Sequence, residues 1–134
     1  MSERLAFDYV LVQVVPRVDR DERFNAGVIL HCAAAAFLGC RLALDQARAR
    51  AFAPDLDVAG VARQLDAIRA VCAGDAAAGP VAALSPSERF HWLAAPRSTV
   101  VQPSVAHVGV CDDPETALDR IFAATVPRAS SPTT

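Results

Sequence analysis

The segment Phe7–Val15 places the strictest constraint on the fold, because its pattern predicts a β-strand without a polar face. Valine, phenylalanine and tyrosine, which favour strands, make up most of the segment. Successive side chains point to opposite faces of a strand, and here both faces are largely apolar. Such a strand needs cover on both sides, so we expect it to lie inside a sheet rather than at an exposed edge.

Other segments predict four further strands. A short charged connection leads into Asn25–Cys32, so the first two strands are expected to form an antiparallel hairpin. Gly27 within this second strand suggests a β-bulge or a close approach of another backbone. Phe37–Leu44 predicts a third strand, and Thr99–Gln102 and Val105–Cys111 predict two more.

Helix signals lie between these strands and near the end of the chain. Asp57–Cys72 is the clearest, because its apolar residues recur at intervals of three and four, and Gly74 supplies a stop. Ser85–Glu88 combines an N-cap, a proline at the first helical position and a capping-box glutamate. Asp113–Glu115 repeats most of this pattern, and Asp45–Phe52 predicts a short helix.

The strands and helices come in separate blocks, which predicts an α+β fold with a mostly antiparallel sheet of about five strands and helices packed on one face. The 134 residues suit a single domain, expected over residues 1–127. The Ser/Pro/Thr-rich tail, 128–134, is expected to be disordered.

The charged residues narrow the possible functions. All 13 basic residues are arginine, so the chain has no lysine for a Schiff base or a phosphate-binding loop. The net charge of −2 argues against electrostatic capture of nucleic acid or an anionic membrane. No apolar run approaches the roughly 20 residues that cross a bilayer, and Met1–Arg4 lacks the features of a signal peptide. We therefore expect a cytoplasmic protein without a membrane partner.

The four cysteines, Cys32, Cys40, Cys72 and Cys111, form no C-x-x-C motif, and none has a histidine at metal-ligand spacing. Scattered cysteines in apolar surroundings usually behave as small hydrophobic residues. We expect buried structural thiols, with a metal or reactive site as the lesser alternative. The sequence predicts neither a metal site nor a cofactor.

The first candidate site is the charged segment Asp19–Arg23 with the nearby Asn25. Its carboxylates and guanidinium groups could bind a metal, a phosphate or the charged surface of a partner. Arg23 and Asn25 are the binding residues predicted here. The alternative is a solvated hairpin loop with weak ion pairs.

The second candidate site lies on the short helix that starts at the capping box. His91 is a natural candidate for proton transfer, because an imidazole exchanges protons near neutral pH. Glu88 lies three residues earlier on the same helix face, and Arg89 could bind an anion. In the alternative interpretation, Phe90 and Trp92 are core anchors and His91 is an ordinary surface residue.

The third candidate site is the turn that contains Arg97 and Ser98, where a guanidinium and hydroxyl groups could hold an anion. Gln102, Gln13 and His107 lie in apolar strands and would line a pocket with Arg97 if they faced one cavity. The alternatives are an ordinary turn and polar core residues with backbone partners. The sequence lacks nucleophile-elbow, zinc-protease, dinucleotide-binding and Walker motifs.

Several longer segments together resemble one family. They are Phe7–Tyr9, Glu22–Val28, Ser87–Leu93, Ala95–Gln102 and Asp113–Pro114. Over nearly the whole chain the sequence resembles the bacterial DUF3037 family, a domain family of unknown function that offers no catalytic residues to transfer. Relatives are often encoded beside a kinase-like protein of the HipA type, so the resemblance implies an accessory role.

Three functions therefore stay open. The first is an interaction module, with a HipA-like kinase as a candidate partner. The second is an enzyme acting on a phosphorylated or nucleotide substrate, in which Arg23, Arg89 and Arg97 bind anionic oxygens and Glu88 or His91 moves a proton. The third, ranked last, is nucleic-acid binding through an arginine patch.

Overall fold

The computed structural model describes residues 4–17 and 22–126. The expected tail, 128–134, and the first part of the charged segment, 19–21, lie outside the described residues. Within them, one sheet organises the fold, and its central strand is β1.

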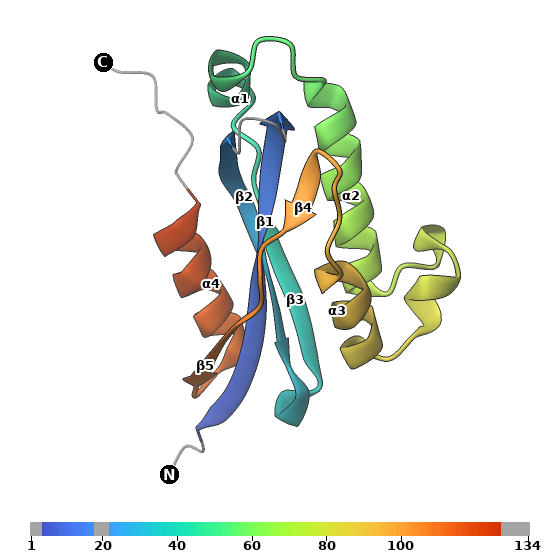
Figure 1. Cartoon of the computed structure of the whole chain (residues 1–134). Helices are drawn as coiled ribbons and strands as arrows, with labels where there is room; N and C mark the ends of the chain where they lie inside the picture. The colour runs from blue at the N-terminus through green and yellow to red at the C-terminus, as the bar shows by residue number, and fades with distance from the viewer. Residues whose placement is uncertain (1–3, 18–21, 127–134) are drawn as a thin grey trace.

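Strand β1 pairs on both of its edges, as its two apolar faces and length predict. It runs antiparallel to β2 along one edge, and to β5 and then β4 along the other. Strand β3 pairs antiparallel with the far edge of β2. The α+β class and the five-stranded antiparallel sheet are confirmed (Figure 1). The strands are β1 (Leu5–Arg17), β2 (Glu22–Cys32), β3 (Phe37–Leu42), β4 (Val101–Pro103) and β5 (His107–Cys111).

The helices begin where the local signals place them. Ser85 Oγ accepts a hydrogen bond from the Glu88 amide at 3.2 Å, and the Glu88 carboxylate accepts one from the Ser85 amide at 3.3 Å, which completes a capping box. Asp57 and Asp113 cap two other helices in the same way, through a side-chain oxygen. The helices are α1 (Gln46–Phe52), α2 (Val58–Ala73), α3 (Pro86–Ala94) and α4 (Pro114–Thr125).

Two hydrophobic clusters lie on opposite faces of the sheet. Val10, Val12 and Val14 of β1 belong to the cluster under α2 and α3. Phe7, whose side chain points to the opposite face of β1, packs in a second cluster with Leu118 of α4. Figure 1 shows α4 on one side of the sheet and α2 and α3 on the other. The expectation that all helices pack on one face is therefore wrong. The physical reason is β1 itself, whose second apolar face also has to be covered.

A β-bulge sits in β2 at Ala26. Val12 is opposite Gly27 while Gln13 is opposite Asn25, so Ala26 is an extra residue without a partner. A Cβ on Gly27 would lie 2.6 Å from the carbonyl oxygen of Arg41, next to the facing Leu42 of β3, so only glycine fits. Both interpretations of Gly27, a bulge and a close backbone approach, are confirmed. The bulge shifts the alternation of β2 by one residue, which turns Asn25 toward α4.

Candidate functional site

Arg89 is held by the end of a helix. Its Nη1 donates to the carbonyl oxygens of Val71 at 2.9 Å and Cys72 at 2.7 Å, and its Nε donates to Leu84 at 3.1 Å. The last carbonyls of a helix have no intrahelical donor, so a guanidinium that reaches them stabilises the helix end. Arg89 therefore closes the C-terminal end of α2.

Arg97 makes a similar contact on α3. Its Nη2 donates to the carbonyl oxygen of Trp92 at 2.8 Å, and its guanidinium carbon lies 4.7 Å from the centre of the Trp92 ring. Ser98 in the following turn is exposed. Gln102 donates through Nε2 to the Thr99 carbonyl at 2.7 Å, so its amide holds the same turn.

Glu88 and His91 are each bound to their own helix. The Glu88 carboxylate belongs to the capping box with Ser85, and His91 Nδ1 lies 2.8 Å from the Ser87 carbonyl oxygen. Across residues 4–17 and 22–126, Glu88 and His91 form no ion pair with each other. Phe90 next to them is 2% exposed, which confirms it as a core anchor, whereas 46% of Trp92 is exposed.

Arg23 and Asn25 lie on the other side of the sheet, in a chain of polar contacts. Arg23 Nη1 donates to Gln13 Oε1 at 3.4 Å, and Gln13 Nε2 donates to Asn25 Oδ1 at 3.1 Å. Asn25 Nδ2 then donates to the Thr125 carbonyl oxygen at 2.9 Å, at the C-terminal end of α4. Gln13 therefore bonds to Asn25, although it lies opposite Gln102 in the β1–β4 pair. His107 stacks on Tyr9 with ring centres 5.1 Å apart.

The sequence-derived site residues consequently fall in three places. Arg23 and Asn25 lie beside α4, Arg89 at the end of α2, and Arg97 at the end of α3. The three arginines therefore lie apart, whereas the enzyme hypothesis requires them to converge in one pocket. Their roles in binding or catalysis stay predictions.

A buried histidine is a feature that sequence reasoning passed over. His31 of β2 is 6% exposed, its Nδ1 lies 3.2 Å from Asp8 Oδ1, and its ring stacks on Phe90 at 5.3 Å. Asp8 and His31 face each other across the β1–β2 hairpin. Aligning the predicted strand ends, Val15 and Asn25, would put Asp8 opposite Cys32, so the sequence alone misses this pair by one residue. Its contacts tie the hairpin to α3.

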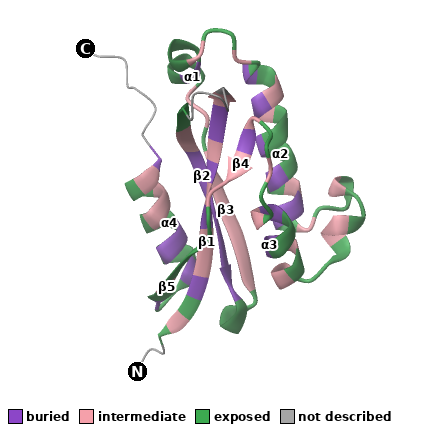
Figure 2. Ribbon diagram, in the orientation of Figure 1, coloured by how far each residue is buried: buried purple, intermediate pink, exposed green. Residues whose placement is uncertain are grey.

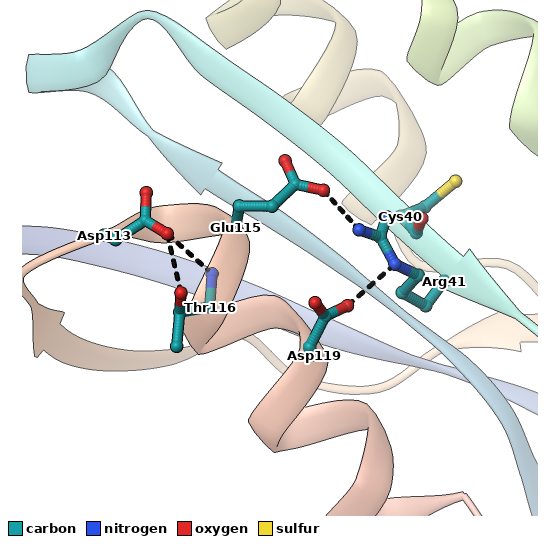
Figure 3. A network of polar contacts seen from close by, with 6 residues as sticks. All are labelled: Cys40, Arg41, Asp113, Glu115, Thr116 and Asp119. Carbon is teal, nitrogen blue, oxygen red and sulfur yellow. Dashed lines mark hydrogen bonds and ion pairs between the residues drawn. The ribbon is translucent and has the colours of Figure 1, made fainter.

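Arg41 joins β3 to α4 through two carboxylates. Its Nη2 pairs with Glu115, its Nε donates to Asp119 at 2.8 Å, and its Nη1 donates to the Cys40 carbonyl at 3.0 Å (Figure 3). The Glu115 carboxylate raises the pKa of Arg41 further above its usual value. Figure 3 also shows Asp113 at the start of α4, bonded to Thr116. This network anchors α4 over the second face of the sheet.

The outer edge of β5 is the most exposed apolar surface. Val108 is 84% exposed and Val110 is 51% exposed, and Val105 just before the strand is 78% exposed. In the described part of the chain, β5 pairs with β1 alone, so its other edge carries no strand. Figure 2 shows most of this strand as exposed.

A charged hollow lies at the end of this edge. It has a volume of about 420 Å³, and Val110, Arg4, Asp112, Asp113 and Arg120 are among its lining residues. Arg4 Nε lies 3.9 Å from Asp112 Oδ1. Acidic residues at the start of α4 repel anions from this helix N-terminus. The hollow therefore places charges of both signs next to the exposed valines.

Metal binding and membrane insertion were the other two possibilities to compare with the described residues. In the described ranges, no group of three or more His, Cys, Asp or Glu side chains could hold a metal ion. Of the helices placed by the structure, none is long and apolar enough to cross a bilayer.

The fold and its surfaces define a small α+β domain with an open, apolar sheet edge and arginines committed to helix ends. The family model described as "Protein of unknown function (DUF3037)" matches residues 9–126, so the chain belongs to this family. No curated protein and no solved structure matches the chain.

Proposed function

We propose that this protein is a small interaction module that binds an extended segment of a partner protein along the outer edge of β5. The observation that carries the proposal is the combination of a free strand edge with valines 84% and 51% exposed at Val108 and Val110. An unpaired edge presents backbone N–H and C=O groups to which another strand can add. Pockets or apolar side chains along the edge then select the partner.

The composition of β5 supports this use. Exposed edges are commonly protected by proline, lysine or inward-pointing charge. The neighbouring β4 contains Pro103, which has no N–H to offer, whereas His107–Cys111 contains neither proline nor a charged Asp, Glu, Lys or Arg side chain. Pairing is therefore less hindered along β5 than along β4.

The hollow beside Val110 supports a partner segment with charge at one end. The same space is lined by two arginines and two aspartates, which are Arg4, Arg120, Asp112 and Asp113. The preferred ligand is an extended peptide with apolar residues at alternate positions, followed by a charged residue. Alternation is required because only every second side chain of an added strand faces the valines.

We place this module in the bacterial cytoplasm, where the free thiols of its four cysteines stay reduced. The family resemblance motivates a HipA-like kinase encoded nearby as the first partner to test. The comparisons themselves name no partner.

The test measures binding of the purified protein to that kinase-like protein by calorimetry, for the natural chain and for Val108→Lys. Burying one valine side chain contributes about 1.5–3 kcal/mol, and each 1.4 kcal/mol is a factor of ten in affinity. We expect Val108→Lys to weaken binding by at least about tenfold.

Leu84→Lys is the matched control, since Leu84 is also an exposed apolar residue but lies outside the edge. It should bind like the natural chain. Equal binding by Val108→Lys and the natural chain would refute the edge as the binding surface. No binding by the natural chain would refute the kinase as the partner.

A further inference from the structure

Two cysteines meet between the sheet and α2. Cys40 of β3 is opposite Ile29 of β2, and facing residues in an antiparallel pair point to the same side. Ile29 belongs to the cluster under α2, so Cys40 points toward that helix. Cys72 completes the buried stripe of α2 and lies in the same cluster. Each thiol is the largest single influence on the pKa of the other, as expected for two side chains that pack together.

Figure 3 agrees with this placement. Arg41 reaches toward Glu115 and Asp119 of α4, while the sulfur of Cys40 points away from both carboxylates. Adjacent residues of a strand face opposite ways, so the thiol and the Arg41 carboxylate network lie on different sides of β3.

Three guanidinium groups hydrogen-bond to backbone carbonyls in or next to the cysteine pair. Arg41 Nη1 donates to the Cys40 carbonyl at 3.0 Å, and Arg69 Nη2 donates to the Leu42 carbonyl at 3.2 Å. Arg89 Nη1 donates to the Cys72 carbonyl at 2.7 Å. Positive charge near a thiol favours its thiolate, which is the form that reacts.

The two thiols differ in their tendency to ionise. The hydrogen bond from Cys72 lowers the pKa of the Cys40 thiol, burial opposes this effect, and the charges of Arg69 and Arg41 add to the lowering. The hydrogen bond to Cys40 and burial both raise the pKa of the Cys72 thiol. One cysteine is therefore inclined to act as a nucleophile while its neighbour keeps its proton.

The solvent exposure of Cys40 and Cys72 supports the same difference in reactivity. Cys40 is half-buried, so a molecule as small as a peroxide can reach it, whereas Cys72 is 6% exposed. The other two cysteines, Cys32 and Cys111, are buried in the cluster under α4. Burial raises the pKa of the Cys111 thiol.

We propose that Cys40 and Cys72 form a peroxide-sensitive pair, in which Cys40 is the reacting thiol and Cys72 the resolving thiol of a disulfide between β3 and α2. This site is separate from the β5 edge, because β1 and β2 lie between β5 and β3 in the sheet. Its test therefore does not depend on the proposed partner.

The reaction consumes one hydrogen peroxide and oxidises two thiols. The Cys40 thiolate attacks one peroxide oxygen, an S–O bond forms, the O–O bond breaks, and the departing hydroxide takes up a proton to become water. Cys72 then loses its proton and its sulfur attacks the sulfur of Cys40. The S–S bond forms, the S–O bond breaks, and the hydroxyl leaves as a second water.

The first experiment uses the reduced full chain without substitutions. Brief alkylation with iodoacetamide, followed by peptide mass analysis, should label Cys40 before the other three cysteines. A second sample that has not been alkylated, treated with a small excess of hydrogen peroxide, should lose two of its four thiols and yield one peptide pair linked through Cys40 and Cys72.

The second experiment separates the two roles. Cys72→Ser should stop at a Cys40 sulfenic acid, trapped as a dimedone adduct, and Cys40→Ser should give neither adduct nor linked peptide. Cys111→Ser is the matched control and should form the disulfide like the natural chain. Preferential alkylation of another cysteine, or a disulfide that forms between two chains instead, would overturn the proposal.

Discussion

Truncation of Leu118 tests whether α4 is part of the core. Leu118 is fully buried between α4 and the sheet, and its Cδ2 would lie 3.1 Å from a Cβ placed on Gly39 of β3. Leu118→Ala removes three carbon groups, each worth about 0.8 kcal/mol when buried, or roughly 2.4 kcal/mol together. The strand backbone beneath cannot collapse into the space, so a cavity adds about 1–2 kcal/mol more.

The expected loss of about 3–4 kcal/mol would be a large part of the free energy of unfolding of a domain this size, typically about 5–15 kcal/mol. Urea unfolding followed by circular dichroism gives the change in midpoint and slope. Leu84→Ala, at an exposed position, should change the free energy by less than about 0.5 kcal/mol. A loss below about 1 kcal/mol for Leu118→Ala would show that α4 does not depend on the second face of the sheet.

Two further substitutions test the polar contacts. Arg89→Ala should lower the free energy of unfolding by about 1.5–3 kcal/mol, because charged hydrogen bonds at the end of α2 are lost. In the same urea titration, the control Arg63→Ala at an exposed position should change it by less than about 0.5 kcal/mol. Unchanged stability of Arg89→Ala would favour a ligand-binding role for this arginine. Hydrogen bonds from Thr116 lower the folded-state pKa of Asp113. The ionised Asp113 therefore stabilises the fold at pH values above its unfolded-state pKa, and this stabilisation is lost as the pH falls through its folded-state pKa. Thermal unfolding should therefore show Asp113→Ala to be less stable than the natural chain near neutral pH, with a difference in stability that shrinks in acid. A difference that does not change with pH would contradict this role of Asp113.

Features set by neighbouring residues were predictable from the sequence. The capping box at Ser85, the aspartate cap at Asp113 and the β1–β2 hairpin each depend on a few adjacent residues, and each is confirmed. The start of β5 differs by two residues, at His107 rather than Val105. Strand ends are weakly specified because the pairing partner, rather than the strand itself, decides where hydrogen bonding stops.

Contacts between distant segments were not predictable in the same way. Arg41 finds Glu115 and Asp119 more than 70 positions later in the sequence, and nothing local marks that pairing. Arg89 and Arg97, which were proposed to bind a ligand, bond to helix carbonyls because a guanidinium has five donors, which suit a carbonyl as well as a phosphate. The position of α4 could have been predicted, because both faces of Phe7–Val15 are apolar and each has to be covered by another element.

The shared strand β1 has a mechanical consequence for the molecule. Its alternate side chains form one wall of each cluster, with Val10 on one side and Phe7 on the other. Loss of either helical layer would expose one apolar face of β1, so both layers depend on the same strand. Strain applied on the α4 side is passed to α2 and α3 through the backbone of a single strand.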